Sequence, residues 1–582
     1  MRRILVFPLS VALLITITSL VGAAGTSNLV NTGSPVAPFS ENKQNEPAVA
    51  IDANHPTILA AGANDNIDME ACNSGDDTTC PFTNGVGVSG IYFSFDSGNH
   101  WKQPTYMGWS ARNCQGAVGP DSGCQPLANG PIGTLPWYYE NGLVSDGDPA
   151  VAFGPKPATN GTFSWSNGSR LYYANLTSNF GATRSEEAFK GFEAIAVSRT
   201  DNVAAAATDG TVGMSAWMPP VIVAKQSSTT FSDKEQIWAD NATSSRFFGT
   251  VYVCWAAFRG QELSPNAAPA PLQVAVSHDG GDTWTKQQIG AAANNRNRNP
   301  MDGCTIRTDS TGNAYLYGIG RQGNDAFEIQ SISTDGGTRW SKPQPVVGPV
   351  TQPGIFDPNT GRTSIDGIAG ARSDLAPAPS VDIANGAPTG SDATNRIVMS
   401  YVSGELTKPH VYFTESTNLG VTWTSPRAIE GATDRGYYAA PAISPNGTTV
   451  YVVYNAFTTP YRSTTATPRS LVGVFLQASA LSGTGPTGAF TEVHRGTSGD
   501  PRGSSQNNLV AEFLGDYVYA AATRTYGVAV WNDTRAAADC PAIDAWRQEL
   551  ANGNLSAPPP APQQDCAPSF GNSDIFSYTT AP

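Results

Sequence analysis

"SHDGGDTW", residues 277–284, is the stretch that decides the fold, because the chain repeats it. Residues 94–101 read "SFDSGNHW", residues 333–340 read "STDGGTRW" and residues 416–423 read "STNLGVTW". Each copy has a serine, then aspartate or asparagine two positions later, then a glycine and a tryptophan. Recurrence of one element along a chain is typical of a repeat architecture.

The repeated box belongs to a larger unit of alternating strands. An apolar, alternating run such as "LQVAVSHD" or "HVYFTEST" precedes each box and predicts a half-buried strand. Two more such runs lie upstream of each of these strands, and one follows each box. The same order of strands continues in units that lack a recognisable box. We therefore predict an all-β protein, a β-propeller of seven four-stranded antiparallel blades with each box in the turn between the third and fourth strands. Six blades are the alternative if one unit is misread.

The ends of the chain predict export and closure of the ring. Residues 1–24 combine two arginines, an apolar stretch and small residues, which predicts a secretory signal peptide; the alternative is an uncleaved membrane anchor. Residues 45–582 form the propeller. Because the seventh unit stops after its third strand, we expect residues 25–44 to supply its outer strand, which leaves few exposed strand edges.

Eight cysteines fit a secreted, disulfide-bonded protein, although sequence alone does not choose their connectivity. They are Cys72, Cys80, Cys114, Cys124, Cys254, Cys304, Cys540 and Cys566. The locally spaced Cys540 and Cys566 enclose a Pro-rich segment and the one convincing short helix, around residues 543–552. The net charge of −14 argues against nucleic acid and anionic membranes as partners, and we expect a monomer with no stable membrane span after signal cleavage.

Within each box the acidic or amide side chain can accept backbone N–H groups of its own turn, the glycine permits positive φ, and the tryptophan fills the space between strands. These boxes resemble the Asp-boxes of the sialidase (neuraminidase) superfamily. The resemblance implies a sialidase-like propeller with its chemistry at the end opposite to the boxes. Asp96, Asp279, Asp335 and Asn418 are therefore expected to be structural.

The resemblance also implies a substrate-binding arginine cluster, a tyrosine nucleophile activated by a glutamate, and an acidic acid/base. Tyr438, before the apolar run of the sixth unit, is the candidate nucleophile, and it is preferred over Tyr437. Glu405 is the candidate partner of the tyrosine, and Asp65 and Asp68 are candidates for the acid/base. The candidate substrate-binding arginines are Arg259, Arg321, Arg372, Arg435 and Arg535, any three of which could grip a carboxylate.

Two departures from the sialidase pattern matter. The first strand lacks its usual arginine and has Asn45 and Glu46 at that place. The predicted innermost strands also begin with acids repeatedly, at Glu46, Asp148, Asp233, Glu235, Asp302 and Asp516. These acids either form a carboxylate-rich ring, in which calcium is possible, or cap N–H groups and pair with arginines. No cofactor is required, and the identity of any metal stays unknown.

The sequence thus predicts a secreted, extracellular or periplasmic, sialidase-like glycoside hydrolase that acts on terminal sugars of extracellular glycans or glycoproteins. The alternative is a non-catalytic propeller that binds glycan or protein at its acidic axial mouth. An endo-acting enzyme or a lyase would instead use two facing carboxylates among Glu46, Asp148, Asp233 and Asp302. Trp109, Trp137, Tyr138 and Tyr139 in the first insertion either stack on sugar rings or anchor their loop.

Overall fold

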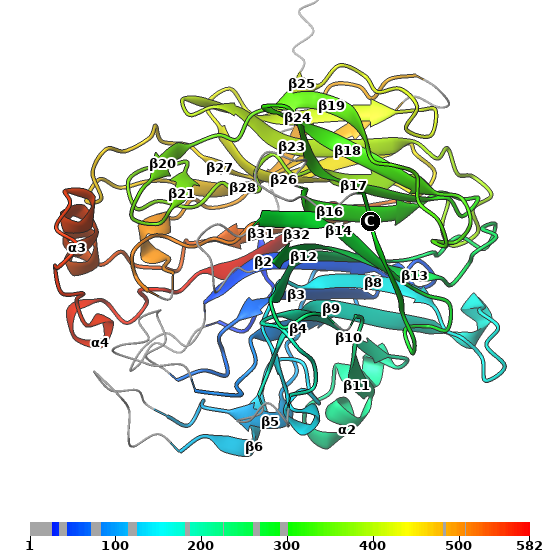
Figure 1. Cartoon of the computed structure of the whole chain (residues 1–582), viewed down its shortest axis with the longest axis horizontal. Helices are drawn as coiled ribbons and strands as arrows, with labels where there is room; N and C mark the ends of the chain where they lie inside the picture. The colour runs from blue at the N-terminus through cyan, green and yellow to red at the C-terminus, as the bar shows by residue number, and fades with distance from the viewer. Residues whose placement is uncertain are drawn as a thin grey trace, which may run out of the picture.

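A computed structural model describes residues 26–33, 43–70, 83–114, 125–180, 187–224, 226–259, 268–290, 301–480, 485–506 and 508–581. The predicted signal peptide, Cys72, Cys80 and Cys124 lie outside these residues. Seven β-sheets surround one axis, and the chain colours in Figure 1 run once around the ring from blue to red. The innermost strands contact one another in a closed circle, β2–β8–β12–β16–β22–β26–β30 and back to β2. The predicted all-β propeller is therefore confirmed, with seven blades.

In the first four blades the main strands follow one another in chain order from the axis outward. Blade 1 contains β2 (Gln44–Ile51), β3 (Leu59–Asp65) and β4 (Ser89–Ser94). Blade 2 contains β8 (Ala150–Pro155), β9 (Ser169–Asn179), β10 (Ala194–Thr200) and β11 (Trp217–Ile222), with β7 (Leu143–Ser145) added beside β9. Blade 3 contains β12 (Thr230–Ala239), β13 (Val251–Arg259), β14 (Ala268–Ser277) and β15 (Thr285–Gln288). Blade 4 contains β16 (Asp302–Thr308), β17 (Ala314–Gln322), β18 (Asp325–Ser333) and β19 (Gln344–Val350).

The last three blades follow the same order. Blade 5 contains β22 (Ser380–Ile383), β23 (Ile397–Glu405), β24 (Lys408–Ser416) and β25 (Arg427–Ala428). Blade 6 contains β26 (Arg435–Ile443), β27 (Thr449–Phe457), β28 (Leu471–Ser479) and β29 (Thr491–Arg495). Blade 7 contains β30 (Tyr519–Ala522), β31 (Gly527–Asp533) and β32 (Asp574–Thr579), and β1 (Asn28–Leu29) pairs with β32 as its outer strand.

Two hairpins and a few short helices lie outside the blades. The hairpins are β5 (Tyr106–Ser110) with β6 (Leu127–Ile132), and β20 (Ile355–Asp357) with β21 (Arg362–Ser364). The helices are α1 (Val203–Ala206), α2 (Gly210–Ser215), α3 (Pro541–Ala551) and α4 (Pro562–Asp565), with 3-10 turns η1 (Tyr139–Asn141), η2 (Trp165–Asn167) and η3 (Pro501–Gly503). Helix α3 is the one predicted from the sequence, and it lies with α4 at the outer edge of the ring (Figure 1).

The four boxes make one repeated set of hydrogen bonds. In the box of blade 3, Asp279 Oδ1 accepts bonds from the Ser277 hydroxyl (2.7 Å) and the Thr283 N–H (2.9 Å), while the Gly281 N–H donates to Ser277 Oγ (2.8 Å). Asp96, Asp335 and Asn418 accept the equivalent two bonds in their own boxes. The side chain thus closes its turn at the end of the ring opposite to the starts of the innermost strands.

The box tryptophans lie between blades. Trp340 of blade 4 packs edge-on against Tyr252 of blade 3, and Trp423 of blade 5 packs in the same way against Tyr317 of blade 4. Trp101 of blade 1 donates a hydrogen bond to Ser577 of blade 7 (2.9 Å). The space that these side chains fill is therefore between neighbouring sheets, where the hydrophobic clusters of the protein also lie.

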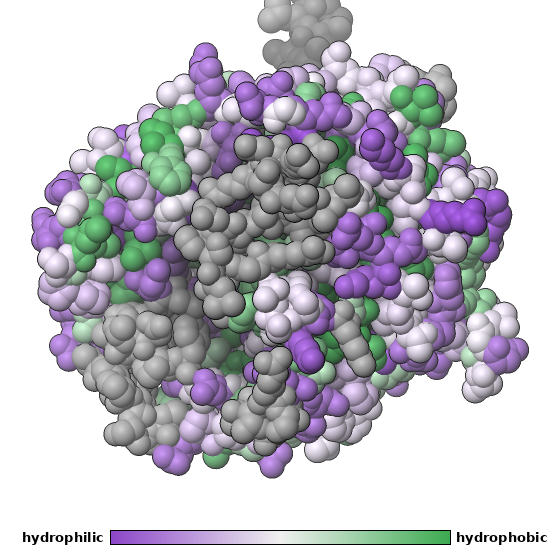
Figure 2. Space-filling view, viewed as in Figure 1, coloured by the Kyte–Doolittle hydropathy of each residue, from purple (hydrophilic) through white to green (hydrophobic). Residues whose placement is uncertain are grey.

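Two disulfides join described residues. Cys254–Cys304 ties β13 of blade 3 to β16 of blade 4, and Cys540–Cys566 ties the start of α3 to the residue after α4. Cys114 is also disulfide-bonded. Within the described part of the chain, no helix has both the length and the apolar character needed to cross a bilayer. Purple and white residues dominate the face shown in Figure 2, and green ones occur in small groups.

Candidate functional site

Five blades share an unusual backbone conformation where their innermost strands begin. The φ angle is positive at Glu46 (56°), Asp148 (49°), Lys234 (63°), Gly303 (54°) and Tyr438 (46°). In β2, β12, β16 and β26 the pairing register shifts at this point, as in a β-bulge. A left-handed residue other than glycine costs about 1–3 kcal/mol, and bulges redirect side chains. This end of the ring therefore holds four strained side chains around the axis.

These side chains take part in one network, which we call the axial cluster. Its members are Glu46, Asp148, Asp233, Lys234, Arg372, Tyr438 and Asp516.

Asp516 is the centre of the axial cluster. Its carboxylate lies 2.7 Å from Lys234 Nζ, and it accepts bonds from Arg372 Nε (3.0 Å) and the Tyr438 hydroxyl (2.6 Å). Burial alone would raise the pKa of Asp516, but the charges of Arg372 and Lys234 outweigh burial and hold that pKa well below its usual range. Asp516 therefore remains a carboxylate.

Glu46 accepts the Asp516 N–H (2.8 Å), and its charge interacts with that of Asp148. Burial, followed by the charge of Asp148, raises the pKa of Glu46 well above its usual value. Burial would also raise the pKa of Asp148, yet the Lys234 ammonium, 3.3 Å away, lowers it overall. Asn64 connects the two residues, donating to Glu46 Oε2 (2.8 Å) and accepting from the Asp148 N–H (2.7 Å). A carboxylic acid and a carboxylate thus face each other at neutral pH.

The predicted acidic ring is present as a paired network. Lys234 Nζ also lies 3.2 Å from Asp233, and Arg372 Nη2 lies 3.3 Å from Glu46. Burial raises the pKa of Asp233 to about 7 and that of Asp302 to about 6. Among the described residues, no group of three or more His, Cys, Asp or Glu side chains is arranged to hold a metal ion. Lysine and arginine pair with the acids of this network.

A cleft of about 1260 Å³ opens at this end of the axis. Blade 1 contributes Asn45, Asn64 and Asn66 to its wall, and blade 2 contributes Asp146, Phe180 and Glu193. Arg372 and Phe513 complete the side nearest the axial cluster, with the guanidinium 4.7 Å from the centre of the Phe513 ring. Amides, carboxyl groups and aromatic rings of this kind are the groups that bind polar ligands in clefts.

The structure does not bring together the four predicted arginines whose side chains it describes. Arg435 donates to the carbonyl groups of Ile365, Leu406 and Thr459. Arg535 pairs with Asp533 and lies 3.8 Å from the centre of the Phe576 ring, and Arg321 is exposed at the end of β17. The side chain of Arg259 lies outside the described residues. Of the four arginines whose side chains are described, only Arg372 reaches the cleft.

Tyr438 is placed differently from an accessible nucleophile. Its side chain is buried and does not line the cleft, and its hydroxyl donates to an aspartate, Asp516, rather than to the predicted Glu405. Burial and the charge of Asp516 raise the pKa of Tyr438 well above its usual value. Glu405 is exposed at the end of β23. The tyrosine therefore lies in the floor beneath the cleft.

The two predicted acid/base residues are saturated with hydrogen bonds. Asp65 accepts from Gln44 (2.6 Å), Tyr92 (2.7 Å) and Gln103 (2.7 Å). Asp68 accepts from the N–H of Gly133 and the hydroxyl of Thr134, in the segment that follows β6. Both side chains are fully buried. They hold the first insertion on blade 1 and do not line the cleft.

The aromatic residues of the first insertion mostly anchor it. Trp109 and Tyr139 stack on each other with ring centres 5.0 Å apart, and Phe180 contacts Tyr139 at 4.9 Å. Trp137 donates to the Met214 carbonyl, and Tyr138 is buried. Phe180, which the sequence did not single out, is the member of this group that lines the cleft.

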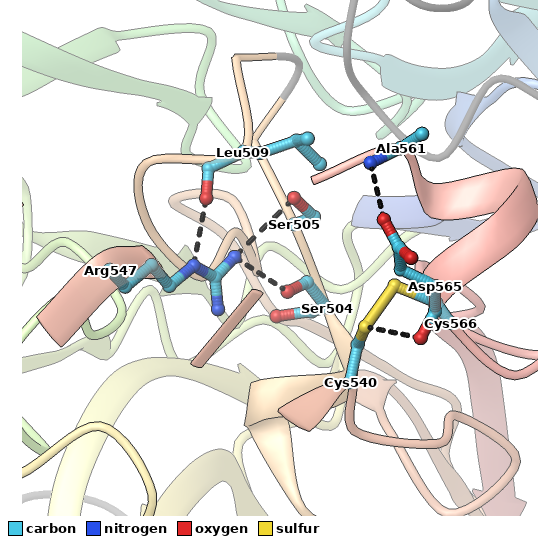
Figure 3. The surroundings of a disulfide bond; sticks show 8 residues. All are labelled: Ser504, Ser505, Leu509, Cys540, Arg547, Ala561, Asp565 and Cys566. Atoms are coloured by element: carbon cyan, nitrogen blue, oxygen red, sulfur yellow. Dashed lines mark hydrogen bonds between the residues drawn. A yellow bond between two sulfur atoms is a disulfide. The ribbon is translucent and has the colours of Figure 1, made fainter. Parts of the chain in front are cut away.

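One wall of the cleft is fixed by the α3 insertion. Residues 504–516 carry Gln506, Asn508 and Phe513 to the cleft and end at Asp516. Arg547 of α3 is buried and donates to the carbonyls of Leu509 (2.8 Å) and Ala511 (2.9 Å). Figure 3 shows its guanidinium between Leu509 and Ser504, beside the Cys540–Cys566 disulfide. The disulfide-tied insertion thus sets the position of this wall.

No protein-family model matches the chain, and no curated protein matches it in sequence. Among solved structures, it resembles a Hadza microbial sialidase (TM-score 0.39, 13% identity, 71% of this chain and 63% of that chain). It also resembles a leech intramolecular trans-sialidase (0.39, 11%, 73% and 67%) and a lectin from Burkholderia pseudomallei (0.38, 11%, 77% and 83%). The chain spans less than two thirds of the first of these proteins.

Proposed function

We propose that this protein is a secreted glycoside hydrolase that acts on sugars of extracellular glycans in the cleft above the axial cluster. The observation that carries the proposal is the set of left-handed residues at Glu46, Asp148, Lys234 and Tyr438. Four strained positions meeting at one end of the axis, beside one large cleft, are a costly arrangement that the fold itself does not require, since three of the seven blades begin without a strained residue. Strain of this kind collects at functional sites.

The chemistry of the cleft supports a sugar as the ligand. Asn45 and Asn66 offer amide groups, and Phe180 and Phe513 offer flat apolar faces. Carboxyl groups in the same wall provide the acid that glycoside hydrolysis needs. Secretion is part of the proposal because the disulfides and the predicted signal peptide both suit an oxidising compartment.

A non-catalytic glycan-binding propeller is the second candidate. The observation in its favour is that every charged member of the axial cluster is already paired within the protein, and Tyr438 is buried. An arginine clamp of the sialidase type is also absent from the described side chains. In this alternative the cleft would bind a glycan without cleaving it.

The test separates the two candidates. The mature protein is incubated with a panel of 4-methylumbelliferyl glycosides, including the α-sialoside and α-L-arabinofuranoside, and with a glycan array. Hydrolysis of one class of glycoside supports the enzyme; binding on the array without any hydrolysis supports the second candidate. Neither binding nor hydrolysis would contradict both.

Phe513→Ala locates the activity. We expect it to weaken binding or kcat/KM about tenfold, because it removes the aromatic face beside Arg372, and tenfold corresponds to about 1.4 kcal/mol. Phe356→Ala is the matched control, since Phe356 is exposed on the β20–β21 hairpin and does not line the cleft. Equal effects of the two variants would place the site elsewhere.

A further inference from the structure

The register of blade 2 places two carboxyl groups side by side in the cleft wall. Strand β9 lies between β7 and β10, and Thr177 of β9 pairs with Ser145 on one side and with Ala194 on the other. Asp146 follows Ser145, and Glu193 precedes Ala194. The two acids therefore meet across the end of β9, although they are far apart in sequence.

Asp146 and Glu193 lie close enough for their charges to interact, and Ser178 of β9 is placed to donate to Asp146 from its hydroxyl and its backbone N–H. Asp146 Oδ2 and Glu193 Oε2 are buried and receive no N–H or hydroxyl donor. Because two neighbouring carboxylates repel each other, the pair favours holding one proton.

Burial and the surrounding charges favour the proton on Glu193. Burial, then the charges of Asp146, Asp233 and Asp148, raises the pKa of Glu193 well above its usual value. Burial also raises the pKa of Asp146, but the two bonds from Ser178 limit the rise, and its pKa is about 6. Above about pH 6, the pair consists of a glutamic acid and an aspartate carboxylate.

The position of the pair suits transfer of that proton to a ligand. Both residues line the 1260 Å³ cleft, and neither belongs to the axial cluster below it. Glycosidases of the two-carboxylate type separate their acids by about 5–5.5 Å or about 6.5–9.5 Å. Two neighbouring carboxyl groups cannot occupy opposite sides of a sugar ring, so they act as one unit with one exchangeable proton.

We propose that Glu193 is the proton donor of this cleft and that Asp146 is the residue that holds it in place. This inference rests on the proposed hydrolase function. The Glu193 O–H proton passes to the glycosidic oxygen, the bond from the anomeric carbon to that oxygen breaks, and its electron pair leaves with the departing alcohol. A water molecule then bonds to the anomeric carbon and returns one proton to Glu193. One water is consumed, and the pair ends with one proton as it began.

The test uses two glycosides of the sugar class that the native protein cleaves, one with an alkyl and one with a 2,4-dinitrophenyl leaving group. Departure of the dinitrophenolate needs no proton, whereas departure of the alkoxide does. We expect Glu193→Gln to lower kcat about 10²–10⁴-fold on the alkyl glycoside and less than about tenfold on the dinitrophenyl glycoside. Retained turnover of the second substrate shows that the variant is folded. Glu140→Gln, at an exposed glutamate of η1, is the matched control.

The pH profile tests Asp146 separately. Native kcat should fall at alkaline pH as Glu193 loses its proton, and Asp146→Asn should move this fall to lower pH because it removes a charge that raises the pKa of Glu193. Equal loss on both substrates, or no loss, in Glu193→Gln would overturn the inference and leave the hydrolase function intact. If the native protein cleaves no glycoside of any class, the proposed function fails and this inference fails with it.

Discussion

Lys234→Met is expected to destabilise the protein by about 3–5 kcal/mol at pH 8. Its ammonium is nearly buried and lies within 3.3 Å of three carboxylates, those of Asp148, Asp233 and Asp516. Removing one partner of a buried ionic network leaves uncompensated charge, which is the costly case for buried ion pairs. Chemical unfolding of the native and variant proteins measures the loss.

The loss should be smaller at pH 5. Without Lys234 the pKa values of the remaining acids rise, so the folded variant binds more protons than the unfolded chain and gains stability as the pH falls. Lys102→Met is the control, because Lys102 is 48% exposed and its pair with Asp209 (3.4 Å) lies on the surface. A Lys234 variant as stable as the native protein at pH 8 would show that the axial cluster is not held by this charge.

Arg547→Met is expected to cost about 1–3 kcal/mol and to loosen one wall of the cleft. The guanidinium donates to the buried carbonyl groups of Leu509 and Ala511. The Ala511 carbonyl keeps a donor in the Gln506 N–H, but the Leu509 carbonyl is left without one, which costs about 1–3 kcal/mol. Because residues 504–516 lead to Phe513 and Asp516, their amide hydrogens should exchange faster with solvent in the variant. Hydrogen exchange followed by mass spectrometry measures the exchange rates of this segment directly.

Arg524→Met is the matched control for Arg547. Arg524 also donates to two carbonyls, those of Gly386 and Ala387, but its side chain is 35% exposed, so water can replace it. We expect a small loss of stability and unchanged exchange at residues 504–516. Unchanged exchange at this segment in Arg547→Met would contradict the role assigned to the α3 insertion.

The fold was predictable because its signals are local. Each box contains its own turn chemistry, and the alternation of each strand is read within a few residues, so seven blades could be counted without any knowledge of contacts. The number of blades is confirmed by the closed circle of innermost strands. The sequence signal for helix α3 was equally local, since a proline occupies the first turn of the helix.

The site was predictable only in part because side-chain direction is not local. The sequence placed Arg435 at the start of an innermost strand, yet its guanidinium turns to three carbonyl groups. Asp65 lies at the end of its strand as predicted, but its carboxylate accepts hydrogen bonds from Gln44, Tyr92 and Gln103. A position along a strand identifies the end of the propeller, whereas the partners of the side chain come from other blades.

Two groups of residues were missed for different reasons. Lys234 stands among acids in the sequence "SDKEQ", and a lone cation at the start of an innermost strand was a signal that could have been read. Asp146 and Glu193 gave no such signal, because only the pairing of β7 and β10 on either side of β9 brings them together. Register of this kind follows from tertiary packing.

The most direct test of the central claim is where a glycan binds. Hydrogen exchange is compared for the native protein alone and with a saturating glycan chosen from the array. We expect slower exchange at Asn64–Asn66, at residues 143–147 and at residues 504–513, with no change at the four boxes at the opposite end of the ring. Protection confined to the box end, or no protection at the axial mouth, would contradict it.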